Sequence, residues 1–369
     1  MEKIFDNDAP FSPRGAGVER RGSATGMADD TNYLGKEASC AGGSNIFIVH
    51  SGEFKTVVGD APLLVKVVEI DAHEGPVYIR EGDALYFTTL PQPTNIPLPG
   101  SRRVAIKQLA LNGDQFPVSA VNITIVRESA NMANGMALDR EGKLVICEQG
   151  TRTEHARISR MDPKTGAIET VVDSWRGLRF NSPNDVVVKS DGTIWFTDPS
   201  YGFLHGFRPQ PVVGDYVYCY DQQTGQLSVV ADSFVKPNGL VFSPDESVLY
   251  VTDSGANQEA DSYYINKPHH IIAFDVLEGQ HLMNQRLFAV VTPGFPDGIK
   301  VDSRGNVYAS SFSGVQVFDP LGDLIGEINL PGTVNFTFGG PGHNILFITT
   351  DDAIWAAVLA TAWANRPRA

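Results

Sequence analysis

Short apolar runs that end at turns recur along most of the chain, and each recurrence opens with a polar side chain. The copy that opens at Asn184 is a clear example, because apolar residues 186–188 are followed by a turn at Asp191 and Gly192 and an apolar return at 194–196. Runs of this kind are typical of β-hairpins. Five clear copies, spaced 50 to 60 residues apart, open at Glu74, Asn134, Asn184, Asn238 and Asp297, and a weaker sixth copy begins at Phe336.

A second strand pair with its own turn follows the hairpins, as at residues 162–166 and 221–225, where Asp opens and Gly closes the turn. Four antiparallel strands per repeat, arranged around an axis, are typical of a β-propeller. The sequence therefore predicts an all-β protein with a six-bladed β-propeller of four-stranded antiparallel blades around a central channel. Unrelated hairpins in a β-sandwich would not explain the same kind of polar residue at the same place in each copy.

The N-terminal segment differs from the repeats. Residues 1–43 are rich in Gly, Ser, Asp and Arg and lack apolar periodicity, which predicts a flexible tail. Residues 44–369 are predicted to form the propeller, which also carries the candidate site.

Composition agrees with a turn-rich globular protein and argues against nucleic acids and anionic membranes as partners. The 369 residues include 36 Gly and 23 Pro, which favours many turns and few long helices. A net charge of −14 disfavours binding to nucleic acid or to an anionic membrane surface. The three cysteines are scattered and no signal peptide is visible at the N-terminus, so we expect a cytoplasmic protein.

The opening residues of the repeats are the candidate site. The first strand of each blade lines the channel, so these side chains should point toward the axis. Buried carboxylates repel one another unless a cation compensates them, and carboxylate and amide oxygens suit Ca²⁺ or Mg²⁺, with Ca²⁺ fitting a wide channel better. Asn134 is the weakest metal candidate and is expected to contact substrate instead.

Three long loops follow the second strands and should border the same end of the channel: residues 90–103, 199–215 and 255–270. Loops of this length are usually functional. Their aromatic residues, such as Tyr201 and His205, either contact substrate or pack on the propeller rim. The usual sequence marks of serine-triad, phosphate-loop, dinucleotide-binding and zinc-protease sites are absent.

Several segments resemble the regucalcin/gluconolactonase family of calcium-dependent six-bladed propellers. They are Glu-Gly-Pro-Val from Glu74, Asn-Ser-Pro-Asn-Asp-Val-Val-Val from Asn181, Pro-Asn-Gly-Leu-Val-Phe from Pro237 and Pro-Asp-Gly-Ile from Pro296. The resemblance covers about residues 60–352. The stretch at 201–209 is similar to the lactonohydrolase branch of that family.

The resemblance implies a ligand set, which coincides with four of the five positions found from the repeat: Glu74, Asn184, Asn238 and Asp297. Some members of the family carry a second acidic residue three positions after the Pro-Asp-Gly aspartate and bind another calcium ion there. Lys300 occupies that position in this chain, which argues against a second site.

The implied activity is that of a metal-dependent lactonase, a carboxylic ester hydrolase that opens a sugar-acid lactone such as gluconolactone. Ca²⁺ would act as a Lewis acid on the ring carbonyl, with Mg²⁺, Mn²⁺ and Zn²⁺ left open as other cations. Asp297 is the candidate catalytic residue that orients or deprotonates the attacking water. Asn134, Asn184 and Glu148 are the candidate substrate-binding residues.

Two alternatives stay open. A phosphotriesterase could use the same calcium, and a propeller that only binds calcium or a protein would need no catalysis at all.

Overall fold

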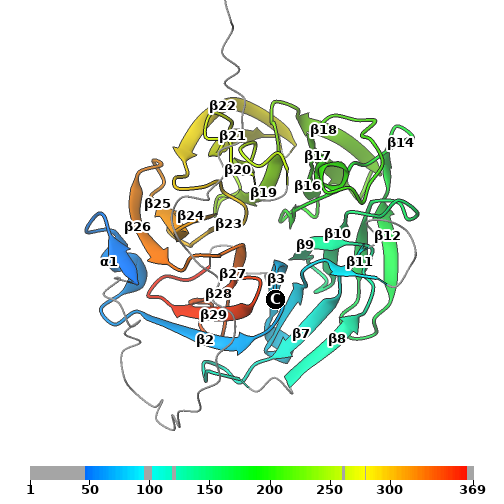
Figure 1. The fold of residues 1–369 in the computed structure, drawn as a ribbon. Coiled ribbons are helices and arrows are strands. Elements are labelled where there is room, and N and C mark those ends of the chain that lie inside the picture. Colours follow the sequence, from blue (N-terminus) through cyan, green and yellow to red (C-terminus); the bar gives the residue numbers. More distant parts are fainter. Residues whose placement is uncertain (1–45, 95–101, 119–121, 260–261, 279, 364–369) are drawn as a thin grey trace, which may run out of the picture.

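Six small antiparallel sheets surround one axis, so the predicted six-bladed β-propeller is confirmed (Figure 1). The computed structural model describes residues 46–94, 102–118, 122–259, 262–278 and 280–363. The predicted tail, residues 1–43, lies outside the described residues.

The first four blades follow the chain from the axis outward. Blade 1 contains β3 (Glu74–Ile79), β4 (Ala84–Thr88), β7 (Ile106–Ala110) and β8 (Ile123–Arg127). Blade 2 contains β9 (Ala133–Leu138), β10 (Leu144–Glu148), β11 (Arg157–Met161) and β12 (Ile168–Val172). Blade 3 contains β15 (Val186–Val188), β16 (Ile194–Asp198), β17 (Tyr216–Asp221) and β18 (Gln226–Ala231). Blade 4 contains β19 (Pro237–Phe242), β20 (Val248–Asp253), β21 (His270–Leu277) and β22 (His281–Val290).

The last two blades recruit strands from the beginning of the chain. Blade 5 contains β23 (Ile299–Val301), β24 (Val307–Ser311), β25 (Gly314–Phe318) and β26 (Leu324–Asn329), and β1 (Phe47–Val49) pairs with β26 as a fifth strand. Blade 6 contains β27 (Asn335–Gly339), β28 (Ile345–Thr349) and β29 (Ala353–Val358), with β2 (Leu63–Glu69) as its outer strand. The repeat pattern does not predict these two pairings, because β1 and β2 precede the first clear copy. Backbone hydrogen bonds between the two ends of the chain thus close the ring.

Few other elements interrupt the blades. They are α1 (Phe54–Val58), the 3-10 turn η1 (Arg80–Gly82), the two-residue strands β5 (Gln92–Pro93), β6 (Arg102–Arg103), β13 (Ser174–Trp175) and β14 (Leu178–Arg179), and α2 (Tyr201–Leu204). No helix among the described residues is long and apolar enough to cross a membrane.

The apolar core lies between neighbouring blades. Trp195 of blade 3 and Phe242 of blade 4 meet edge to face, with ring centroids 5.4 Å apart. Tyr308 of blade 5 and Phe338 of blade 6 repeat this contact at 5.3 Å. Because each blade packs on two others, the ring holds the inner strands in fixed positions, and those strands carry the site.

We expect Val67→Asp to unfold the propeller, because Val67 lies in β2, is fully buried and would place an unpaired carboxylate in the core. The loss in the free energy of unfolding should exceed about 3 kcal/mol. Leu63→Asp is the matched control, since Leu63 lies in the same strand and is 44% exposed. Chemical denaturation of both variants checks this, and equal stability would contradict closure of the ring by β2.

Candidate active site

The five predicted channel residues lie at the same end of the inner strands. Glu74, Asn134 and Asn238 lie in the first or second position of β3, β9 and β19, while Asn184 and Asp297 stand two residues before β15 and β23. Each inner strand contacts the inner strands of its two neighbours, from β3 through β9, β15, β19, β23 and β27 back to β3. The ring therefore brings these side chains to one end of the channel.

At three of the opening residues, a threonine near the end of the second strand hydrogen-bonds the backbone and links the residue to the blade before it. The Thr197 hydroxyl donates to the Asn238 carbonyl oxygen at 2.7 Å, and the Thr252 hydroxyl donates to the Asp297 carbonyl oxygen at 3.2 Å. Thr88 makes the same contact to Asn134, and Thr349 donates to the carbonyl oxygen of His73, the residue before Glu74. Sequence analysis missed this function, although the threonine recurs in the repeat and could have revealed it.

The glycine after the opening residue is required by the close approach of neighbouring strands. An ideal Cβ on Gly239 would lie 2.4 Å from the Asp297 carbonyl oxygen, and one on Gly135 would lie 2.4 Å from Asp185 Oδ1. Neither glycine has a positive φ, so the missing side chain matters here and the backbone conformation does not. The Asn-Gly pairs are therefore packing signals at the axis, and they are not turns.

Two of the predicted residues are carboxyl groups that contact each other. Glu74 is 3% exposed and accepts a hydrogen bond from Asn335 Nδ2 at 2.7 Å. Burial raises the pKa of Glu74 above its usual range. Burial and then the negative charges of Glu74 and Asp185 raise the pKa of Asp297 well above its usual range, and the Asp297 and Glu74 carboxyl groups lie within hydrogen-bonding reach of each other. Without a positive charge between them, the two groups cannot both be ionised at low energetic cost.

Asp185 is a third acidic group at the axis, and sequence analysis did not select it. Val186 N donates to its Oδ1 at 2.9 Å, and Leu240 N donates to its Oδ2 at 3.4 Å. Burial raises the pKa of Asp185, and the nearby Lys300 ammonium lowers it. Lys300 thus supplies a positive charge beside the channel. It stands at the position where some members of the family carry an acidic residue that binds a second calcium ion.

Unpartnered amide oxygens complete the candidate cation site. Asn238 Nδ2 donates to Ser254 Oγ at 3.1 Å, but the buried Oδ1 atoms of Asn238 and Asn134 have no hydrogen-bond partner among the described residues. Buried polar atoms normally have partners, so these oxygens fit a ligand role. Across the part of the chain that the structure describes, no three His, Cys, Asp or Glu side chains are placed to hold a metal ion. A cation here would therefore need amide as well as carboxylate oxygens.

Glu148, a predicted substrate contact, already uses both of its carboxylate oxygens. Arg127, Arg157, Asn131 and Ser159 all donate to it, at distances from 2.5 to 3.3 Å, and the side chain is fully buried. These bonds lower its pKa despite the burial. Glu148 therefore joins blades 1 and 2, and the structure gives it no free oxygen at the channel.

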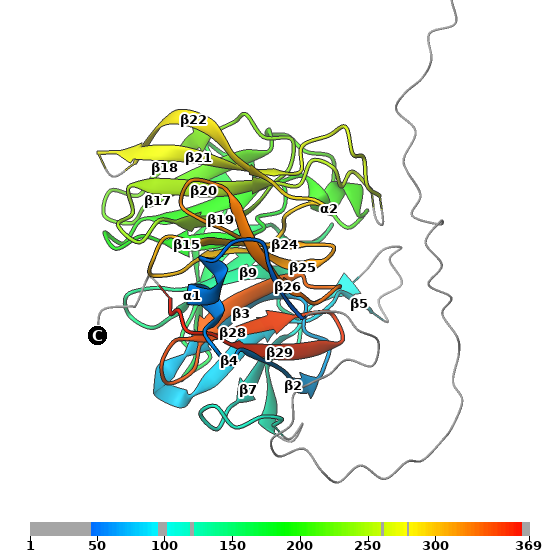
Figure 2. The same cartoon turned by 90° about the vertical axis from the view of Figure 1, so that its left-hand side faces the viewer.

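Two of the three long loops lie on the face of the site as far as they are described. Figure 2 shows α2, in loop 199–215, and β5, in loop 90–103, at the same end of the propeller. Residues 95–101 and 260–261 of the loops lie outside the described residues.

Comparison with known proteins identifies the family. Residues 72–352 match the SMP-30/Gluconolactonase/LRE-like region. The chain belongs to this family. It is 30% identical to a gluconolactonase of Zymomonas mobilis over 299 residues, which cover 79% of this chain and 80% of that protein. It is 28% identical over 317 residues to the lactonohydrolase oryL of Aspergillus oryzae, with 79% of this chain and 69% of that protein covered.

A solved structure shows the same likeness in three dimensions. The gluconolactonase of Xanthomonas campestris is 31% identical and superposes with a TM-score of 0.69, covering 86% of this chain and 96% of that one. Together these similarities support a lactone hydrolase.

We expect Gly239→Ala to destabilise the protein by about 1 to 3 kcal/mol, because the added methyl group would meet backbone atoms of the next blade. Gly82→Ala is the control, since a Cβ there would meet nothing within 4 Å. Denaturant titration measures both variants. A Gly239→Ala variant as stable as the control would show that the strands at the axis can separate freely.

Proposed function

We propose that this protein hydrolyses a sugar-acid lactone, such as gluconolactone, with one divalent cation, Ca²⁺, bound at the end of the propeller channel. The observation that carries the proposal is the close approach of two carboxyl groups, the buried Glu74 and the partly exposed Asp297, beside the amide oxygen of Asn238, which has no hydrogen-bond partner among the described residues. Such a cluster is costly without a cation, and the relatives are lactone hydrolases by name.

The residues that would hold the cation are Glu74, Asn184, Asn238 and Asp297. They offer two carboxylates and two amide oxygens, which are hard ligands of the kind that Ca²⁺ prefers. The charges also support a single ion, because Glu74, Asp185 and Asp297 carry three negative charges when ionised and Lys300 balances one of them. A bound Ca²⁺ would polarise the lactone carbonyl and draw a water molecule close to it.

The protein side chains would supply the proton transfer. Asp297 accepts a proton from water as the water oxygen attacks the carbonyl carbon, and the ring C–O bond then breaks. The proton passes to the departing ring oxygen, so that lactone and water yield the hydroxy acid. Asp297 is suited to this role because its side chain is the partly exposed member of the carboxyl pair.

Substrate hydroxyl groups would be held by Asn134 and Asn184, which neighbour each other through the hydrogen bond from Gly135 N to the Asn184 carbonyl oxygen at 2.7 Å. Direct substrate contact by Glu148 stays a prediction. Its saturated hydrogen bonds support an indirect role, in which it orients Asn131 at the same rim.

We expect Asp297→Asn to lower kcat/KM for gluconolactone by at least a hundredfold, because the amide cannot accept the proton. Asp323→Asn, at an exposed turn, is the control and should match the wild type. Acid release from gluconolactone measures both. Retained activity in Asp297→Asn would remove this residue from its proposed role, and activity of the wild type on a phosphotriester alone would overturn the lactonase assignment.

We expect Ca²⁺ to stabilise the protein by about 2.7 kcal/mol at a concentration one hundred times its Kd. Glu74→Gln should lose most of this effect, whereas Glu141→Gln, at an exposed turn, should keep it. Thermal unfolding with EDTA and with added Ca²⁺ measures the shift, and calorimetric titration should give one ion per chain. Lactone hydrolysis that survives EDTA unchanged would contradict metal dependence.

A further inference from the structure

Helix α2 lies beside the candidate cation site and carries one buried tyrosine. Tyr201 is 7% exposed, and its ring stacks on His205 with centroids 5.8 Å apart. Ser200, the residue before Tyr201, accepts a hydrogen bond from Lys236, which stands two residues before Asn238 in the chain. Ser254, Asn238 and Asp297 are among the groups that act on the Tyr201 hydroxyl. The helix therefore brings a hydrogen-bonding group from blade 3 to residues that open blades 4 and 5.

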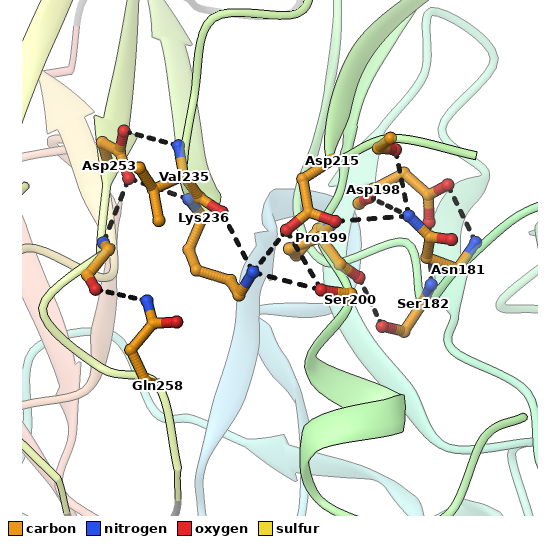
Figure 3. Close-up of polar contacts among 12 residues, drawn as sticks. Asn181, Ser182, Asp198, Pro199, Ser200, Asp215, Val235, Lys236, Asp253 and Gln258 are labelled. Atoms are coloured by element: carbon orange, nitrogen blue, oxygen red, sulfur yellow. Dashed lines mark hydrogen bonds and ion pairs between the residues drawn. The ribbon is translucent and has the colours of Figure 1, made fainter. Parts of the chain in front are cut away.

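A buried lysine of blade 4 holds the beginning of this helix (Figure 3). Lys236 is 7% exposed, and its ammonium donates to Asp215 Oδ2 at 2.5 Å and to Ser200 Oγ at 3.1 Å. Ser200 Oγ also donates to Asp215 Oδ2 at 3.1 Å, and Ser200 directly precedes α2. The backbone N of Lys236 donates to Asp253 Oδ1 at 2.9 Å, which fixes the lysine to the end of β20.

A buried arginine holds the same helix from the side of blade 2. Arg208 is 5% exposed, and its guanidinium donates only to backbone carbonyl oxygens among the described residues. Two of these belong to Thr151 and Glu154 of blade 2, and its own backbone N donates to the Gly202 carbonyl oxygen at 2.9 Å. Gly202 N in turn donates to Ser182 Oγ at 2.9 Å.

Burying the charged side chains of Lys236 and Arg208 beside a four-residue helix costs free energy, because each must be desolvated and then fully paired. Apolar packing would suffice to cover the rim. Ionic and hydrogen-bonding contacts from both sides instead fix the position of the helix, and with it the position of the Tyr201 hydroxyl.

We propose that Tyr201 is a further catalytic residue, whose hydroxyl donates a hydrogen bond to the lactone oxygen that becomes negatively charged as water attacks, and that the Lys236–Asp215 pair is the positioning device for it. This inference rests on the proposed lactone hydrolysis and adds a residue to it. In this role Tyr201 donates a hydrogen bond through its hydroxyl and transfers no proton. A fixed donor of this kind stabilises the transition state more than the substrate.

We expect Tyr201→Phe to lower kcat/KM for gluconolactone by about tenfold to a few hundredfold, mostly through kcat, because only the hydroxyl is removed. Its thermal unfolding and its Ca²⁺ affinity should equal those of the wild type. Tyr220→Phe is the matched control, since Tyr220 lies in the same blade, near the end of β17 that is farther from the loop carrying α2. Tyr201→Phe within twofold of the wild type would overturn the inference.

The positioning role is tested by removing the ion pair as a pair, with Lys236→Met and Asp215→Asn together, so that no buried charge is left unpaired. This double variant should lose kcat as Tyr201→Phe does, and adding Tyr201→Phe to it should cause little further loss. Lys189→Met is the control, because Lys189 is a similarly enclosed lysine that pairs with Asp191 and Glu246 in turns outside the site. Losses that multiply would show that the ion pair and Tyr201 act independently, and this would overturn the positioning role.

These results separate the inference from the proposed function. Turnover of gluconolactone by the wild type that is insensitive to Tyr201→Phe would refute the inference alone. Absence of turnover in the wild type would refute both.

Discussion

Electrostatic repulsion at the propeller axis is the constraint on which the site depends. Glu74 and Asp185 lie close enough to Asp297 to raise its pKa, whereas His73 lowers the pKa of Glu74 and Lys300 lowers that of Asp185. Ionised carboxylates at such positions would push the inner strands apart. The fold must therefore hold these groups together by other means until a cation neutralises them, and that need explains several features that the repeat alone leaves unexplained.

The repeat itself supplies the opposing force. Threonines such as Thr197 and Thr252 bind the backbone of the opening residue in the next blade, and glycines such as Gly239 allow that blade to approach closely. Aromatic contacts between blades and the pairing of β2 with β29 complete the ring. Since every blade is held by two neighbours, a local repulsion at the axis cannot be relieved by moving one strand.

The rim adds an asymmetry that the ring lacks. Only blade 3, among the blades as described, carries a helix between its second and third strands, and Lys236 and Arg208 fix this helix from blades 4 and 2. The symmetric ring thus brings the carboxylates and amides together, while the segment that contains α2 places the Tyr201 hydroxyl beside them. The ligands of a cation and the hydrogen-bond donor to the reacting lactone oxygen can in this way come from different parts of one fold.

The sequence by itself determined the blade number, the inner strands and the opening residues, because strands that repeat around an axis impose their period on every blade. It also indicated oxygen ligands, since Glu74, Asn184, Asn238 and Asp297 share one phase of the repeat. Tertiary structure alone decided what depends on contacts between distant segments. These contacts are the pairing of β2 with β29, the hydrogen bond from Arg127 to Glu148, the proximity of Lys300 to Asp185 and the placement of Tyr201 near Asn238. Each of them joins residues from different repeats or from different ends of the chain. Periodicity fixes where a residue lies within its own blade, but the residue that faces it across a blade boundary is set only when the ring closes.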